Sequence, residues 1–260
     1  MLDDEEATAM EGFESRTGKT AVVTGGSSGL GRASALALAS AGARVAVLAR
    51  GSEDLHETVR QVGDLGGDAR PFVVDLADAA EVERSWAEVT DALGAADVLV
   101  NAAGTDVPGA VSDPAVADWD RVLDVNLRAS FLLARAAWPG MRERGGGTIV
   151  NVSSVAGRRG WANASAYCAT KFGLTGFTQA LAAEGREHGI RACVLYPGAM
   201  DTSWGAWSPA DRTAPARGAA PGEALPPEHV ARLITWIAAA PPGLVLNEVT
   251  VTPLLEGGWP

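Results

Sequence analysis

The sequence predicts an α/β fold: a single domain built on a doubly wound, mostly parallel, seven-stranded Rossmann-type sheet. Short apolar segments alternate with longer helical ones along most of the 260 residues, which is long enough for one such domain and its core. The apolar segments are Val/Leu/Ala runs without polar alternation, as is typical of strands buried on both faces. Strand–helix–strand repetition favours right-handed crossovers and therefore parallel pairing.

The expected elements follow in chain order. We expect strands at residues 20–24, 44–49, 70–74, 98–101, 148–152, 192–196 and 248–252. We expect helices at 29–41, 52–65, 79–93, 116–144, 165–188 and 227–240. The first helix is rich in alanine, the second should stop at Gly66-Gly67, and Pro139 should kink the fourth. Ligands of such sheets bind beyond the carboxyl ends of the strands, so we expect the site there.

Two stretches fall outside this pattern. Residues 1–16 form an acidic segment with one positive side chain, at its last position, which predicts a disordered, solvated tail before a domain at 17–260. Residues 201–226 are rich in Pro, Ala and Gly and predict a substrate lid. Trp204 and Trp207 favour a lid over a floppy connection, because large aromatic side chains usually cover something apolar.

Composition excludes several classes of function. The formal net charge of −11 argues against a nucleic-acid partner, which requires a basic face. No apolar run approaches the roughly 18 residues that span a membrane, and the N-terminus lacks a signal-peptide pattern, so we expect a cytoplasmic protein without a membrane partner. Two cysteines, Cys168 and Cys193, and three histidines give no metal-ligand spacing, so we expect buried thiols and no metal.

A glycine-rich turn joins the first predicted strand to the first predicted helix. Glycine lets the backbone approach a pyrophosphate, and a helix N-terminus offers it free N–H groups and partial positive charge. A tight turn without a ligand is the alternative. The cofactor-binding candidates of this turn are Gly25, Ser27, Ser28, Gly29, Leu30 and Gly31.

Further motifs occur in a fixed order after the turn. TGGSSGLG is followed by Asn101-Ala102-Ala103-Gly104, Asn126 in DVNL, Ser154 thirteen residues before Tyr167, Tyr167-Cys168-Ala169-Thr170-Lys171, and Pro197-Gly198-Ala199-Met200-Asp201-Thr202. Over roughly residues 17–252 the chain therefore resembles the short-chain dehydrogenase/reductase family. The resemblance implies an oxidoreductase that uses a nicotinamide dinucleotide, with Asn126, Ser154, Tyr167 and Lys171 as its catalytic set.

The chemistry of the catalytic set agrees with this resemblance. Tyr167 and Lys171 lie one helical turn apart, and an ammonium and an oxidised nicotinamide would lower the pKa of the phenol so that it can exchange a proton. Ser154 can stabilise charge on the substrate oxygen, with Ser153 as its neighbour in a supporting place. The resemblance implies that Lys171 holds the nicotinamide ribose and that Asn126 holds a water, although Asn126 could instead cap local backbone groups.

The cofactor is predicted to be NADP(H), with NAD(H) the less favoured choice. Ala49 stands where an NAD-binding family member places an acid, and the next residue, Arg50, can pair with a 2′-phosphate. Ser28 stands where many NADP-users have a second basic residue. By resemblance the remaining contacts are Asp75 (adenine, or a helix N-cap), Leu76, Asn101, Ala102, Ala103, Gly104, Pro197, Gly198 and Thr202 (carboxamide, or a turn residue).

The predicted substrate is a ketone or secondary alcohol with an apolar or cyclic body. Its candidate walls are Thr105, Val107, Trp161, Asn163, Met200, Trp204 and Trp207. Arg158 and Arg159 could receive an anion but are expected to be surface or interface residues. Family members pair their two long central helices, here 116–144 and 165–188, so we expect a homodimer or homotetramer. A non-catalytic dinucleotide-binding sensor is the alternative function, and the complete catalytic set argues against it.

Overall fold

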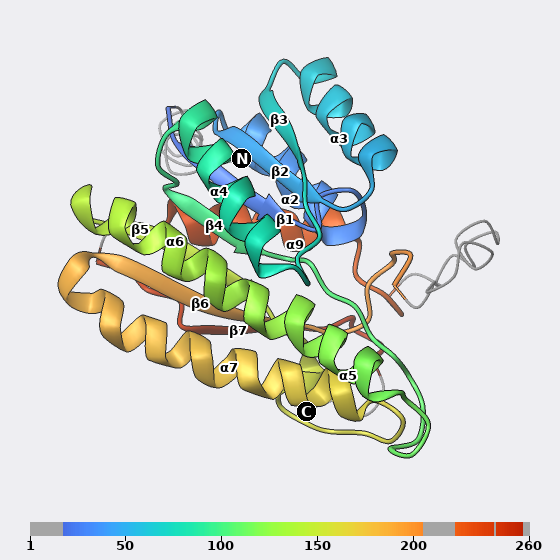
Figure 1. Ribbon diagram of the computed structural model, residues 1–260. Helices are drawn as coiled ribbons and strands as arrows, with labels where there is room; N and C mark the ends of the chain where they lie inside the picture. Colours follow the sequence, from blue (N-terminus) through green and yellow to red (C-terminus); the bar gives the residue numbers. More distant parts are fainter. Residues whose placement is uncertain (1–17, 205–221, 242, 257–260) are drawn as a thin grey trace.

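The structure is a computed structural model, which describes residues 18–204, 222–241 and 243–256. Seven strands form one sheet in the order β3-β2-β1-β4-β5-β6-β7, and all six neighbouring pairs are parallel (Figure 1). The strands are β1 (Thr20–Thr24), β2 (Arg44–Ala49), β3 (Asp68–Val73), β4 (Val98–Asn101), β5 (Gly147–Val152), β6 (Ile190–Pro197) and β7 (Glu248–Val251). The predicted doubly wound sheet is confirmed, and it is fully parallel.

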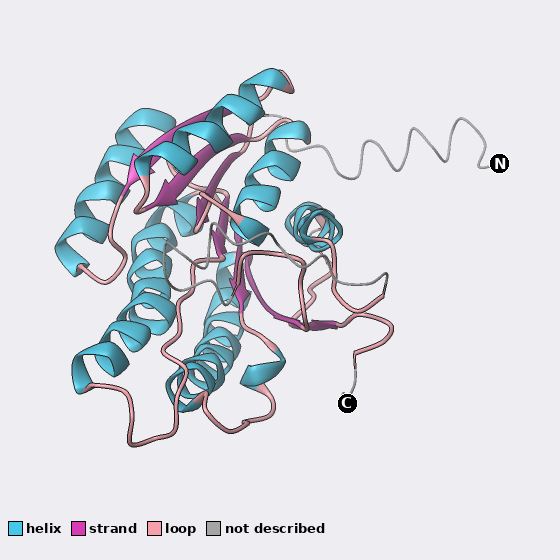
Figure 2. Cartoon of the chain, turned by 90° about the vertical axis from the view of Figure 1, so that its right-hand side faces the viewer, coloured by secondary structure: helices cyan, strands magenta, loops and turns pink. Residues whose placement is uncertain are grey.

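Helices cover both faces of this sheet (Figure 2). They are α2 (Gly29–Ser40), α3 (Ser52–Asp64), α4 (Ala79–Leu93), α5 (Val116–Leu123), α6 (Ala129–Glu143), α7 (Ser165–Gly185) and α9 (Pro227–Ala239). One apolar core lies between the sheet and α2, α3 and α9, and a second lies between the sheet and α4, α6 and α7. The central strands are buried on both faces for this reason, as their unbroken apolar runs predict.

Most predicted element ends agree with the structure to within one or two residues, as is usual for fraying ends. The exception is the continuous helix expected at 116–144. The structure divides it into α5, a π-helical turn at Asp124–Arg128, and α6. Pro139 lies inside α6, which continues past it to Glu143, so the helix is divided at the π-helical turn and not at the proline. The helix expected at 165–188 ends as α7, followed by a single 3-10 turn, Arg186–His188.

The strand order places the site. β1 pairs with β2 on one side and with β4 on the other, so the connections run in opposite directions from this point and leave a crevice at the carboxyl ends of β1 and β4. Pro71 lies in the edge strand β3, where a missing N–H is tolerated. Within the described ranges, none of the helices has the length and apolar character needed to cross a membrane.

Candidate active site

The glycine turn lies between β1 and α2, at the carboxyl end of β1. Gly25 has a left-handed φ of +69°, and a Cβ there would lie 2.8 Å from the Cα of Ala103. A Cβ at Gly31 would lie 2.2 Å from the carbonyl oxygen of Gly25, so only glycine permits a turn this tight. Ser28 is the N-cap of α2, but its side chain makes no capping hydrogen bond, which leaves the first-turn N–H groups for a ligand. The turn therefore fits a dinucleotide pyrophosphate.

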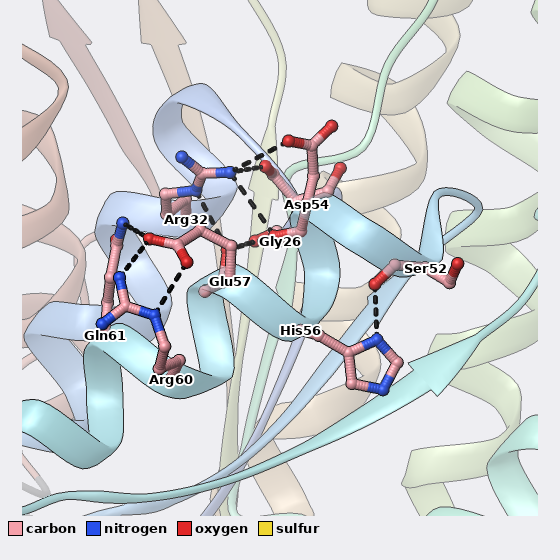
Figure 3. A network of polar contacts seen from close by, with 10 residues as sticks. Gly26, Arg32, Ser52, Asp54, His56, Glu57, Arg60 and Gln61 are labelled. Carbon is pink, nitrogen blue, oxygen red and sulfur yellow. Dashed lines mark hydrogen bonds and ion pairs between the residues drawn. The ribbon is translucent and has the colours of Figure 1, made fainter.

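Side chains from the neighbouring helix hold the turn in shape (Figure 3). The hydroxyl of Thr58 in α3 donates to the Gly26 carbonyl oxygen at 2.8 Å. The guanidinium of Arg32, one residue beyond Gly31, donates through Nε to the Thr58 hydroxyl at 3.0 Å and through Nη2 to the carbonyl oxygen of Ser27. It also lies 3.8 Å from a carboxylate oxygen of Asp54. Sequence reasoning missed Arg32 and Thr58, although a basic residue directly after the turn was a visible signal.

The segment that follows β4 is tied to the same turn. The hydroxyl of Thr24 accepts hydrogen bonds from the N–H groups of Ala102 and Ala103, each at 3.1 Å. The amide of Asn101 donates to Asn151 Oδ1 at 2.8 Å, and the amide of Asn151 donates to Thr178 at 2.8 Å. These bonds fix the backbone of β1, β4 and β5 where the three strands end, so the predicted cofactor contacts at residues 101–104 lie beside the glycine turn.

Ser154 and Tyr167 meet beyond the carboxyl end of β5. The Ser154 hydroxyl is hydrogen-bonded to the phenol of Tyr167, which lies in the first turn of α7, and accepts a hydrogen bond from the Ala156 N–H at 3.1 Å. Ser153 is buried, and its hydroxyl donates to the carbonyl oxygen of Lys171 at 3.1 Å. The serine that faces the tyrosine is therefore Ser154, and Ser153 fixes the helix that carries the tyrosine.

Lys171 completes this cluster from inside α7. Its side chain is only 3% exposed, and its ammonium donates to the carbonyl oxygen of Val152 at 2.8 Å. The Nζ atom lies 5.4 Å from the centre of the Tyr167 ring, within the range of a cation–π interaction. Burial lowers the pKa of Lys171 from 10.5 to about 8.

The pKa of Tyr167 moves in the other direction. Burial raises it above its ordinary value; the Ser154 hydrogen bond lowers it, while the charges of Asp106 and Cys168 raise it further. The lowered pKa that was expected from the nearby lysine is therefore not found in the protein alone, where burial dominates. The phenol of the free protein is held in its protonated form, which is the form that can give a proton away.

Asn126 lies in the π-helical turn and is buried. Its Oδ1 accepts from the Thr105 N–H at 2.8 Å, and its Nδ2 donates to the Thr105 carbonyl oxygen at 2.8 Å and to the Thr170 hydroxyl at 3.2 Å. Asn126 thus binds backbone groups, as the alternative interpretation had it, but those groups are 21 residues away and border the site. Single π-helical turns occur frequently at functional sites.

Comparison with known proteins agrees with this geometry. A family model described as short chain dehydrogenase matches residues 19–212. The chain is 40% identical over 217 residues to a short chain dehydrogenase of Pseudocercospora fijiensis, an alignment that covers 82% of this chain and 70% of that protein. It is 39% identical over 192 residues to the D-threitol dehydrogenase of Mycolicibacterium smegmatis, covering 73% and 74%. It is also similar to a metagenomic short-chain oxidoreductase solved in complex with NADP, with a TM-score of 0.80, 34% identity, and 92% and 99% covered.

The chain belongs to the short-chain dehydrogenase family. It is an NAD(P)-dependent short-chain dehydrogenase/reductase that acts on CH–OH and C=O groups. The resemblance expected from the motifs is confirmed at this level. The individual site residues are placed by the geometry alone, and the family match does not test them.

In this short-chain dehydrogenase, Arg50 directly follows the last residue of β2 and is exposed. Within the described residues its guanidinium forms no ion pair. Its charge helps to lower the pKa of Asp75, which places the two side chains near one another. Leu76, predicted as a cofactor contact, has its side chain in the apolar core, so only its backbone is available to a ligand.

Asp75 is not the helix N-cap that was its alternative role. Asp78 caps α4, accepting from the N–H groups of Ala80 and Glu81 at 2.8 and 3.1 Å. The Asp75 carboxylate instead contacts Arg121 Nη2, which lies 3.0 and 3.1 Å from its two oxygens. Burial raises its pKa, but a hydrogen bond from an adjacent backbone N–H and the Arg121 guanidinium outweigh that effect and lower it. Asp75, the residue expected to contact adenine, is therefore already paired with the guanidinium of Arg121.

The two ends of the segment expected to be a lid are joined at its base. Leu225 N–H donates to the Ala199 carbonyl oxygen at 2.8 Å, and Asp201 N–H donates to the Leu225 carbonyl oxygen at 2.9 Å. Thr202 packs against Gly29, and its hydroxyl accepts from the Trp204 N–H at 3.2 Å, so it acts here as a turn residue beside the glycine turn. Residues 205–221, with Trp207, and the predicted tail at 1–16 lie outside the described residues.

Trp204 lies beside Tyr167. Its ring centre is 5.3 Å from that of Tyr167, and the ring lies 3.4 Å from where a Cβ on Gly104 would be. Of the other candidate walls, Thr105, Val107 and Met200 are half-buried, whereas Trp161 and Asn163 are exposed. Arg158 is not free to receive an anion: it forms an ion pair with Glu248 and lies 4.3 Å above the centre of the Tyr196 ring.

Proposed function

We propose that this protein is an NADP(H)-dependent oxidoreductase that moves a hydride between a nicotinamide ring and a carbonyl or secondary alcohol carbon. The observation that carries the proposal is the convergence of Ser154, Tyr167 and Lys171 beyond β5, beside a glycine turn whose helix N-terminus has no side-chain cap. A non-catalytic sensor is not favoured, because related proteins are named as dehydrogenases and oxidoreductases.

The side chains divide the work of this reaction. A bound nicotinamide supplies or accepts the hydride. Tyr167 gives a proton to the substrate oxygen during reduction and takes it back during oxidation, while the Ser154 hydroxyl stabilises the negative charge on that oxygen. Lys171, fixed by the Val152 carbonyl oxygen, places a positive charge beside the phenol and stabilises its deprotonated form. Asn126 keeps Thr105, and with it the wall of the site, in a fixed position.

The preference for NADP(H) is supported by the surroundings of the expected 2′-phosphate. Ala49 places no acid at the end of β2, and Arg50 offers an exposed guanidinium without an ion-pair partner in the ranges the structure describes. A guanidinium can bind a phosphate through two parallel hydrogen bonds. The similar metagenomic oxidoreductase was solved with NADP, which agrees with this preference.

Fluorescence titration with NADPH and NADH tests the cofactor preference. We expect wild type to bind NADPH at least about tenfold more tightly than NADH, and Arg50→Ala to remove most of that difference, since each lost charge-assisted contact is worth about tenfold or more. Arg60→Ala is the matched control, because Arg60 lies on α3 and is already paired with Glu57 (Figure 3) and with Asp64. Equal binding of the two cofactors by wild type would refute the preference.

Steady-state kinetics with Tyr167→Phe tests the catalytic assignment. Loss of the proton donor should lower kcat by about 10²- to 10⁴-fold. NADPH binding should change less than about threefold, because the rest of the cofactor site is intact. A variant that retains near-normal turnover would show that Tyr167 is not the acid.

The substrate is proposed to be a small ketone or secondary alcohol with an apolar or cyclic body. The aromatic ring of Trp204 supports this proposal, since it gives the region around Tyr167 an apolar wall. Val107 and Met200 are half-buried and are proposed as further apolar walls. The similar D-threitol dehydrogenase is named for a polyol, which favours hydroxylated substrates as a second candidate class.

A homodimer or homotetramer is proposed to form through the helices of one face. Phe131 on α6 and Phe172 on α7 are each nearly half exposed, and Phe131 packs edge-to-face on Phe177 with ring centres 6.1 Å apart. Burying such side chains on a second copy would stabilise an assembly. Light scattering of wild type and Phe131→Asp would distinguish an oligomer that dissociates from a monomer that is unchanged.

A further inference from the structure

The carboxylate of Asp106 borders the site, and Asp106 is not among the candidate substrate walls named so far. Asp106 follows Gly104 and Thr105 in the segment that leaves β4. On one side of Asp106, the side-chain amide of Asn126 holds the backbone N–H and the backbone carbonyl oxygen of Thr105. On the other side, Gly109 N–H donates to the Asn163 carbonyl oxygen at 3.0 Å and Gly109 pairs with Ala164, just before α7. The segment that contains Asp106 is therefore fixed beside the end of α7 that carries Tyr167.

The carboxylate of Asp106 has an incomplete set of partners. Its Oδ1 accepts a hydrogen bond from the Val107 N–H at 2.7 Å, and the side chain is half-buried. Across the described residues, its Oδ2 makes no hydrogen bond and no cation lies within ion-pair distance. Burial raises the pKa of Asp106, and its charge raises the pKa of Tyr167. A carboxylate in such surroundings is stabilised by any hydrogen-bond donor that reaches it.

An aromatic face bounds the same space. Trp204 lies over the ring of Tyr167 and against Gly104, two residues before Asp106. A molecule that places its reacting oxygen on Tyr167 and Ser154 thus meets an apolar ring and a carboxylate oxygen. Binding sites commonly combine apolar walls with a few polar groups that decide specificity.

We propose that Asp106 is a specificity-determining residue that accepts a hydrogen bond from a substrate hydroxyl adjacent to the reacting carbon. The preferred substrates are then vicinal diols and α-hydroxyketones. This inference rests on the proposed function and deepens it. In oxidation, the reacting carbon loses a hydride to the oxidised cofactor, its hydroxyl proton passes to Tyr167, and the neighbouring hydroxyl bound to Asp106 is unchanged. Substrates with a carboxylate at that position are disfavoured by like-charge repulsion.

A matched pair of alcohols tests the proposal. We would measure kcat/KM with NADP⁺ for trans-1,2-cyclohexanediol and for cyclohexanol, which has the same ring without the second hydroxyl. A hydrogen bond to a charged acceptor corresponds to a ratio of about 10 to 100 in favour of the diol for wild type. Asp106→Ala should reduce that ratio to near one, and Asp106→Asn, which keeps an accepting oxygen, should give an intermediate ratio. A ratio that Asp106→Ala leaves unchanged would overturn the proposal.

Asp113→Asn is the control for removing a negative charge from the same loop. Asp113 is exposed, and its carboxylate accepts hydrogen bonds from the Ala110 N–H and the Ser112 hydroxyl. It should keep the wild-type ratio. If wild type turns over neither alcohol, the unfolding midpoint measured in the presence of NADP⁺ provides the test. The diol should then raise the midpoint of wild type more than it raises that of Asp106→Ala. Equal increases in the two proteins would refute the inference.

The pH profile supplies a readout that a merely structural role would not move. The groups facing the Tyr167 phenol are the Ser154 hydroxyl, the Lys171 ammonium, the Cys168 thiol and the Asp106 carboxylate. The Asp106 carboxylate raises the pKa of Tyr167, so Asp106→Asn should shift the rising limb of the pH profile of kcat/KM for oxidation to lower pH. Asp113→Asn should leave that limb where it is in wild type. An unshifted profile would contradict the proposal. Failure of the proposed function looks different, because NADPH binding would then be absent or Tyr167→Phe would retain turnover.

Discussion

The buried ammonium of Lys171 should destabilise the protein at neutral pH by an amount that disappears at alkaline pH. Burial lowers its pKa from 10.5 to about 8, so between these values the unfolded chain holds more protons than the folded protein. Stability rises with pH wherever the unfolded state binds more protons. The cost of the buried charge is therefore complete below about pH 8 and disappears toward pH 10.5. At about 1.4 kcal/mol per pKa unit, this cost is about 3 kcal/mol.

Urea unfolding of wild type and Lys171→Met measures this cost, because methionine has a similar length and cannot ionise. Between about pH 7.5 and about pH 10, the free energy of unfolding of wild type should rise relative to the variant by about 2 kcal/mol. Ionisations shared by both proteins cancel in the difference, including that of Cys193, whose pKa burial raises to about 12. Lys19→Met removes an exposed lysine and should show a flat difference. Parallel curves for wild type and Lys171→Met would refute a charged, buried Lys171.

Two further predictions concern stability and the cofactor turn. Arg158→Met should lower the free energy of unfolding by about 1 kcal/mol, because it removes a partly exposed ion pair with Glu248 and a cation–π contact with Tyr196. Thermal unfolding measures this loss as a lower midpoint. An unchanged midpoint would mean that these contacts contribute nothing to stability. Gly31→Ala should weaken NADPH binding more than about tenfold, because its Cβ cannot lie 2.2 Å from the Gly25 carbonyl oxygen. Wild-type affinity in a fluorescence titration would show that the turn can relax.

The sheet was predictable from the sequence because its central strands are buried on both faces. Runs such as Ala21-Val22-Val23 and Val98-Leu99-Val100 have no polar position, and only a covered parallel sheet accommodates them. The π-helical turn was not predictable. It carries Asn126, whose amide binds Thr105, and that pairing depends on tertiary structure and not on the local pattern of the helix.

The same distinction separates the site residues that were predicted from those that were missed. Tyr167 and Lys171 lie one turn apart on a helix, so their spacing alone brings them together. Arg32 stabilises the glycine turn only because its guanidinium turns back to the Ser27 carbonyl oxygen, and side-chain direction is not visible in a motif. Asp106 offered one signal, a charge between the apolar candidate walls, but its place beside Tyr167 depends on the pairing of Gly109 with Ala164.

Burial changes the pKa values of Tyr167 and Lys171 in opposite directions, and in the proposed reaction these two effects together favour reduction in the free protein. It raises the pKa of the Tyr167 phenol and lowers that of the Lys171 ammonium, so each group is driven toward its neutral form. A neutral phenol is the proton donor that reduction requires. Oxidation requires the phenolate, which the Lys171 ammonium and any further positive charge beside Tyr167 would stabilise against burial and the Asp106 carboxylate. In the proposed reaction, an oxidised nicotinamide bound beside Tyr167 would supply such a charge and a reduced one would not, so the phenolate would be favoured for oxidation and the neutral phenol for reduction.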